Sequence, residues 1–133
     1  MQTGSTDSDG PVNQSEGIAV RKLLLVDDEV DGADFAAVLL RSHGLQVLVA
    51  HSATEALQVL QDDKEIDAVL TDVMMPGMSG LQLASSIREK YPALKIVLMS
   101  GYVLPELLTA QEPPYLFATK PYRIDTILEL LRS

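Results

Sequence analysis

Five short apolar runs, each followed by a stretch of different spacing, constrain the fold of this chain more than any other feature. Most of the runs are continuous rather than alternating, which is typical of strands that helices cover on both faces of a sheet. We predict strands at 22–26, 45–50, 66–71, 95–99 and 115–119. Strands that alternate with helices favour right-handed parallel crossovers, so the sequence predicts an α/β fold with a five-stranded, doubly wound parallel sheet.

Helical spacing appears between these runs. In the first helix, predicted at 34–42, Phe35, Val38 and Leu39 have the i, i+3, i+4 spacing of an apolar face, and Gly44 is suited to end the helix. Ser52 and Glu55 form an S-x-x-E pattern that predicts a capping box at the start of the second helix. Further helices are predicted at 81–90, near 105–110 and at 125–131.

Composition places these elements in one domain. The chain has 133 residues, of which 47% are hydrophobic, which is enough for a real core. It lacks cysteine, so it has neither disulfides nor thiolate metal sites. Residues 1–20 are rich in Ser, Gly and Asp without an apolar period, and we interpret them as a flexible tail or linker before a domain at 21–133.

Charge and hydropathy exclude some partners. The net charge is −9 and Lys and Arg are not clustered, so we expect no direct contact with nucleic acid. No apolar run has the length of a membrane span, and the N-terminus lacks the pattern of a secretion signal. We therefore expect a cytoplasmic protein that does not contact the membrane.

Polar residues stand at the ends of four of the five predicted strands. The first strand ends in Asp27-Asp28, the third in Asp72, the fourth in Ser100 and the fifth in Lys120. In doubly wound sheets the binding site lies at the carboxyl ends of the strands, where the strand order reverses. The sequence therefore predicts that these side chains share one site.

The chemistry of that site follows from its charges. Three carboxylates at one edge repel one another, and a hard divalent cation with oxygen ligands, such as Mg²⁺ or alternatively Mn²⁺, removes that cost. A cation, the Lys120 ammonium and the Ser100 hydroxyl around Asp72 are the groups that stabilise a phosphoryl group in transfer. A carboxylate nucleophile would form an aspartyl phosphate.

Four motifs carry a resemblance to a known family. They are VDDE at 26–29, DVMMPGMSG at 72–80, MSG at 99–101 and TKP at 119–121, in this order and each at a strand end. Over about 21–132 the chain resembles the receiver domain of two-component and phosphorelay response regulators. The resemblance implies the flavodoxin-like strand order 2-1-3-4-5 and a phospho-accepting function.

The resemblance also implies a function for each matching position. Asp72 corresponds to the phospho-acceptor, and Asp28 and Asp72 to direct ligands of Mg²⁺. Asp27 would act through water, and the backbone carbonyl of Met74 would be a further ligand.

Further positions correspond to the family's switch. Ser100 matches the hydroxyl that moves toward the phosphoryl group, and Lys120 pairs with the acceptor or the phosphate. Phe117 matches the switch aromatic, although it replaces the commoner Tyr and has no phenol hydroxyl. The peptide bond between Lys120 and Pro121 is expected to be cis.

The partners implied are a histidine kinase or a histidine phosphotransfer protein, and downstream a protein target or a parent hybrid kinase. The chain ends near the last predicted helix, which fits either a stand-alone receiver or a receiver from a hybrid histidine kinase. The alternative is an interaction module of the same fold that works without phosphorylation. We expect no enzymatic activity beyond Mg²⁺-dependent self-phosphorylation from a donor and self-dephosphorylation.

Several residues also have simpler interpretations. We interpret Asp31 or Asp34 as a helix N-cap, and we assign His43 and His51 no function at the acidic edge. Gly77 or Gly80 is expected to allow a turn after Asp72.

Overall fold

The computed structural model describes residues 20–101, 115–121 and 123–132. Its five strands form one parallel sheet in the order β3-β2-β4-β5-β6. Numbered along the chain, this is the order 2-1-3-4-5, so the predicted fold is confirmed. The strands are β2 (Lys22–Val26), β3 (Gln46–Ala50), β4 (Ala68–Asp72), β5 (Lys95–Ser100) and β6 (Leu116–Thr119).

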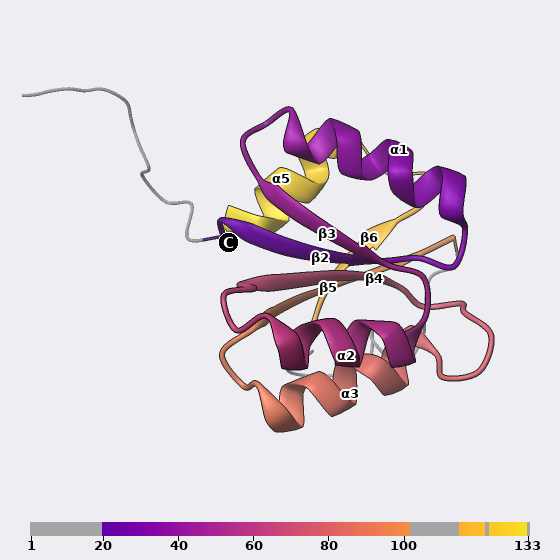
Figure 1. The fold of residues 1–133 in the computed structure, drawn as a ribbon. Helices are drawn as coiled ribbons and strands as arrows, with labels where there is room; N and C mark the ends of the chain where they lie inside the picture. Colours follow the sequence, from indigo (N-terminus) through magenta and orange to yellow (C-terminus); the bar gives the residue numbers. More distant parts are fainter. Residues whose placement is uncertain (1–19, 102–114, 122, 133) are drawn as a thin grey trace, which may run out of the picture.

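Helices cover both faces of the sheet (Figure 1). On one face lie α1 (Val30–Arg41) and α5 (Ile124–Arg132), and on the other lie α2 (Ala53–Asp62) and α3 (Gly80–Lys90). The continuous apolar strands supply both layers: in β2, Leu23 and Leu25 pack toward α1 and α5, whereas Leu24 and Val26 pack toward α2 and α3. Burial on both faces is the physical reason that these strands do not alternate.

The first helix is correctly predicted, but its buried face is not the predicted one. Phe35 is 67% exposed and Val38 is 59% exposed. The face against the sheet consists of small residues and one leucine, with the i, i+3, i+4, i+7 spacing: Ala33, Ala36, Ala37 and Leu40. Alanines let the helix backbone approach the sheet closely, so the larger side chains lie on the outer face.

The start of this helix is also corrected. The helix begins at Val30 rather than at Asp34, and its N-cap is Glu29, whose side chain makes no capping hydrogen bond. Asp31 therefore lies in the first turn and Asp34 inside the helix, so neither is an N-cap. An acid in the first turn still interacts favourably with the helix dipole.

Other helix ends follow their sequence signals more closely. Gly44 has φ +94° after α1, and Gly77 has φ +74° in the turn before α3. The Ser52 hydroxyl caps α2 by accepting from the Glu55 backbone N–H at 3.1 Å. The complete capping box lies instead at α3, between Ser79 and Gln82.

Two strand ends differ from prediction in a way that affects the site. β4 spans Ala68–Asp72 and β5 extends through Ser100, so Asp72 and Ser100 are the last residues of their strands. The predicted helix near 105–110 and most of the tail at 1–20 lie outside the described residues. Within the part of the chain that the structure describes, no helix has both the length and the hydropathy to cross a membrane.

Candidate functional site at the carboxyl edge of the sheet

Backbone hydrogen bonds continue past the strand ends and fix the residues of this edge. The Asp27 N–H donates to the Ala50 carbonyl at 3.1 Å, and the Lys120 N–H donates to the Ser100 carbonyl at 2.8 Å. Beyond Asp72, the Val73 N–H donates to the carbonyl of Met99 at 2.9 Å. Main-chain hydrogen bonds between neighbouring segments therefore fix the backbone at Asp27, Ser100 and Lys120 and directly after Asp72.

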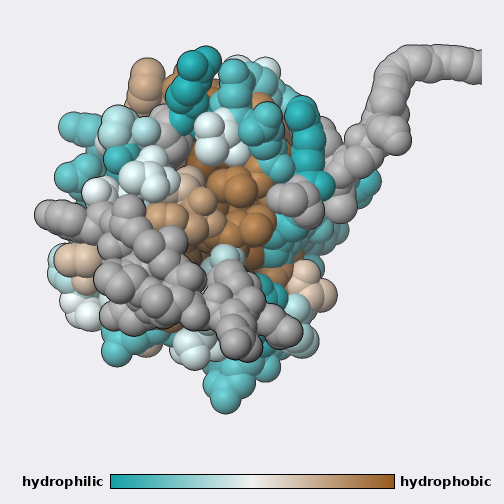
Figure 2. All heavy atoms as spheres, turned by 180° about the vertical axis from the view of Figure 1, so that it is seen from behind, coloured by the Kyte–Doolittle hydropathy of each residue, from teal (hydrophilic) through white to brown (hydrophobic). Residues whose placement is uncertain are grey.

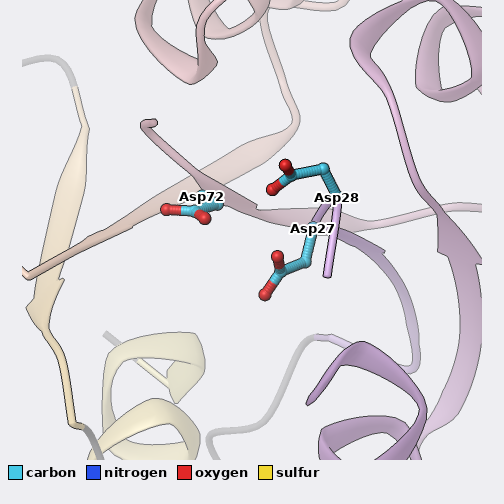
Figure 3. A group of neighbouring side chains, drawn as sticks. All are labelled: Asp27, Asp28 and Asp72. Carbon is cyan, nitrogen blue, oxygen red and sulfur yellow. The ribbon is translucent and has the colours of Figure 1, made fainter. Parts of the chain in front are cut away.

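Three carboxylates meet at this edge. One oxygen from each of Asp27, Asp28 and Asp72 lies within 4.8 Å of the others. Figure 3 shows Asp27 and Asp28 on the segment after β2, and Asp72 on the neighbouring strand, β4. Asp27 is 6% exposed and Asp72 is 7% exposed, so two of these acids are held in a site with little water.

A lysine partly balances these charges. The Nζ of Lys120 lies 3.2 Å from an oxygen of Asp72 and 3.8 Å from an oxygen of Asp27. The pKa of the Asp72 carboxyl is raised overall, mainly because the group is buried and also because of the nearby charge of Asp27. Lys120 and the backbone N–H of Met74 act in the opposite direction and lower this pKa. The site thus favours a further positive charge beside Asp72.

The start of α3 lies close to the Asp72 backbone because its first residue, Gly80, has no side chain. A Cβ built on Gly80 would lie 2.1 Å from the Asp72 carbonyl oxygen and 2.8 Å from its carbon. The Gly80 N–H also donates to the Val73 carbonyl at 2.9 Å. Of the two glycines considered from sequence, Gly77 supplies the turn, and Gly80 supplies the close approach to the site.

The predicted switch residues lie on the neighbouring strands. Ser100 is fully buried at the end of β5, where it pairs with Thr119 of β6. Phe117, also on β6, is half-buried against the hydrophobic cluster on the α2 and α3 side. The Lys120–Pro121 peptide bond is cis.

His51, to which the sequence assigned no function, does lie at this edge. Its Nδ1 is 3.0 Å from the carbonyl oxygen of Asp27, so the ring lies beside the first of the three acids. The available signal was its place directly after the β3 strand, which neighbours β2. His43 lies elsewhere, with its Nδ1 3.0 Å from the Leu39 carbonyl oxygen at the end of α1.

The donor set at this edge fits a hard divalent cation. The grouped side-chain atoms are carboxylate oxygens, which Mg²⁺ and Mn²⁺ prefer over the nitrogen and sulfur ligands of softer metals. Two of the three acids are buried, so their mutual repulsion is only partly screened by water. A bound cation would therefore stabilise the arrangement.

Comparison with known proteins identifies the family of the chain. Residues 23–132 match the family model described as the response regulator receiver domain. A putative NtrX-like response regulator of Rickettsia bellii is 31% identical over 114 residues, covering 83% of this chain and 24% of that protein. The chain spans about a quarter of the length of curated relatives of this kind.

Solved structures show the same fold. The receiver domain of the hybrid histidine kinase CckA is 33% identical with a TM-score of 0.68, covering 81% of this chain and 93% of that one. The response regulator TrrA of Thermotoga maritima, crystallised with Mg²⁺ and beryllofluoride, is 28% identical with a TM-score of 0.73, covering 82% and 94%. On the family match and the shared fold, this chain belongs to the response regulator receiver domains of two-component and phosphorelay signalling.

Proposed function

We propose that the chain accepts a phosphoryl group on Asp72 and thereby switches a surface that binds a partner protein. The observation that carries this proposal is the position of the Lys120 ammonium, 3.2 Å from Asp72 and beside a group of three carboxylates. A cation-binding acidic group next to an ammonium is the arrangement that neutralises a phosphoryl group during transfer. The receiver domain family supports the same function.

Mg²⁺ is the proposed cofactor, with Mn²⁺ as the alternative ion. The three carboxylates that meet at this edge would hold it. By the family resemblance, Asp28 and Asp72 would bind directly and Asp27 through water, and the backbone carbonyl of Met74 would be a further ligand. When bound, the ion supplies positive charge to the phosphoryl oxygens. TrrA, a relative that shares the fold, was crystallised with Mg²⁺ and a beryllofluoride group, which supports this assignment.

The proposed reaction transfers a phosphoryl group from a phosphohistidine of a kinase or a histidine phosphotransfer protein. A carboxylate oxygen of Asp72 forms a bond to phosphorus while the phosphorus–nitrogen bond of the donor breaks. The electron pair of that bond returns to the donor imidazole, which takes up a proton from solvent. The side chain of Lys120, already beside Asp72, then pairs with the new phosphoryl oxygens.

The donor must approach this edge, and an exposed apolar surface lies next to it. Phe35 and Val38 on the outer face of α1 are more than half exposed. A pocket beside them is lined by residues of α1 and of the segment that follows β6: Gly32, Phe35, Ala36, Leu39, Lys120, Pro121 and Ile124. Because Lys120 belongs both to this lining and to the phosphoryl site, we assign this surface to the donor.

The switch is assigned to Ser100 and Phe117. Phosphorylation would shift an existing equilibrium toward a state in which the Ser100 hydroxyl approaches the phosphoryl group and Phe117 changes its packing. Figure 2, seen from the side of β6 and α5, shows hydrophobic residues in the middle of this face, with hydrophilic residues above them and to the right. We place the output surface here, for a downstream target or a parent hybrid kinase, with residues 1–20 as a tail or linker.

The experiment is Mg²⁺-dependent uptake of beryllofluoride, followed by amide NMR of the wild type and Asp72→Asn. We expect the wild-type signals of Asp72, Ser100 and Lys120 to shift and those of the variant to stay in place. Incubation with a phosphorylated histidine kinase should give acid-labile phosphate on the wild type alone. A wild type that takes up neither Mg²⁺ nor the mimic would favour the alternative, an interaction module that works without phosphorylation.

A further inference from the structure

His51 connects the start of α2 to the acidic edge. Its backbone N–H donates to the Glu55 carboxylate at 2.9 Å. Its ring Nδ1 lies 3.0 Å from the carbonyl oxygen of Asp27. Because a carbonyl oxygen can only accept, Nδ1 carries the hydrogen and donates it to Asp27.

This arrangement explains why the predicted capping box at α2 is incomplete. In a capping box the carboxylate of Glu55 would accept from the backbone N–H of Ser52. Here it accepts from the preceding residue, His51, while the Ser52 hydroxyl still caps the Glu55 N–H. The turn between β3 and α2 is thereby fixed on both sides of His51. The β3 strand directly precedes this residue, and Glu55 of α2 accepts a hydrogen bond from its backbone N–H.

Asp27 receives the other end of this connection. Its N–H donates to the Ala50 carbonyl at 3.1 Å, and its side-chain Oδ1 accepts from the Glu29 N–H at 3.0 Å. With the bond from His51, the main chain of Asp27 is held at both its N–H and its carbonyl group. Asp27 and Asp28 directly follow β2, so the orientation of the Asp27 main chain determines the direction of both side chains.

We propose that His51 is a positioning residue of the cation site, which holds the Asp27–Asp28 peptide through the Nδ1–H to carbonyl hydrogen bond. The inference rests on the proposed function only in taking this site to bind Mg²⁺. The held peptide contains the Asp27 carbonyl and the Asp28 N–H, so the hydrogen bond acts on both acids at once. Outer hydrogen bonds of this kind tune metal affinity without touching the metal.

The test compares two variants that both lack the imidazole ring. His51→Ala removes the donor, whereas His51→Asn keeps an N–H donor at the same distance along the side chain. Both lose the ring current, so the difference between them reports the hydrogen bond alone. His43→Ala is the matched control, because it removes the same kind of ring-to-carbonyl hydrogen bond just after the C-terminal end of α1.

Two readouts are measured: the Asp28 amide nitrogen shift of the metal-free protein, and Mg²⁺ affinity by calorimetry. We expect His51→Ala to weaken Mg²⁺ binding by about threefold to tenfold and His51→Asn to restore it to within about twofold. The Asp28 amide of the Asn variant should lie nearer to the wild type than that of the Ala variant. His43→Ala should leave both readouts unchanged.

Two results would overturn the inference: His51→Ala binding Mg²⁺ as tightly as the wild type, or His51→Asn behaving like His51→Ala in both readouts. A wild type without Mg²⁺ affinity, in which the Asp28 amide still separates the two variants, would instead overturn the cation site of the proposed function. The same result would support the positioning of Asp27 by His51. The metal-free readout therefore keeps the two failures apart.

Discussion

The ammonium of Lys120 lies 3.2 Å from Asp72 and joins two elements that are far apart in the sequence, the end of β4 and the segment after β6. It is also 3.8 Å from an oxygen of Asp27, so a single ammonium group forms ion pairs with two buried acids. One positive charge among three carboxylates leaves the site with a negative balance. This imbalance is the physical basis for the cation binding and the phosphoryl transfer that we propose at this edge.

Replacing Lys120 should separate cation binding from the phosphoryl response. In Lys120→Met we expect Mg²⁺ affinity to be retained or to increase, because a competing positive charge is removed. The beryllofluoride-induced amide shift of Ser100 should be lost, since the mimic lacks its ammonium partner. Calorimetry and amide NMR measure the two effects. Lys64→Met, which removes an exposed lysine over the Tyr91 ring, is the charge-matched control and should leave both unchanged.

The raised pKa of Asp72 predicts a dependence of stability on pH. Burial is the main cause of the increase, so between the ordinary aspartate pKa of 3.8 and the higher folded pKa the native state binds more protons than the unfolded state. The free energy of unfolding therefore falls as pH rises through this window and stays lowered above it. Asp72→Asn removes this effect, and at neutral pH without metal the variant should unfold at a temperature a few degrees higher.

The difference in stability between the wild type and Asp72→Asn should depend on both pH and Mg²⁺. Thermal unfolding of the wild type and Asp72→Asn should converge as pH falls below the ordinary aspartate value, and added Mg²⁺ should stabilise the wild type more than the variant. Asp34→Asn, at an exposed position on α1, should show neither effect. A wild type as stable as Asp72→Asn at neutral pH without metal would contradict the prediction.

The close approach at Gly80 should make an alanine there costly. Since the added Cβ would lie 2.1 Å from the Asp72 carbonyl oxygen, backbone must move, and we expect Gly80→Ala to lower the free energy of unfolding by about 3 kcal/mol. Mg²⁺ affinity should fall as well, because the Asp72 backbone shifts. Chemical denaturation measures the first effect and calorimetry the second.

Gly32→Ala is the matched control for that substitution. Gly32 lies inside α1, and the nearest atom to an added Cβ is the Glu29 side chain at 3.8 Å. Alanine is the better helix former, so this variant should gain about 0.5–1 kcal/mol of stability. Equal effects at the two glycines would show that close packing at Asp72 is not what requires Gly80.

The exposed residues of α1 should affect transfer rather than folding. We expect Phe35→Ser to change the free energy of unfolding by no more than about 0.5 kcal/mol, because the side chain is mostly exposed. Phosphoryl transfer from a histidine kinase should slow, whereas uptake from a small donor such as acetyl phosphate should not change. Leu40→Ala, on the buried face of the same helix, should instead cost about 2–5 kcal/mol. Unchanged transfer from the kinase in Phe35→Ser would remove this surface from the proposed docking site.

The strands and the shared edge were determined by the sequence itself. Continuous apolar runs such as 22–26 are local patterns, and they identify strands buried on both faces without knowledge of their neighbours. Once these strands are parallel, their carboxyl ends must meet at one edge, so Asp28, Asp72 and Lys120 could be grouped from their places in the chain. Both inferences depend on spacing along the chain, which the sequence states directly.

Only the tertiary structure decided which groups touch. It placed the alanines of α1, and not Phe35, against the sheet, because the distance between helix and sheet selects for small residues. It likewise brought Gly80 against the Asp72 carbonyl and the His51 ring against Asp27. Each of these contacts depends on distances of a few ångströms between different segments, and periodicity along a single segment carries no information about such distances.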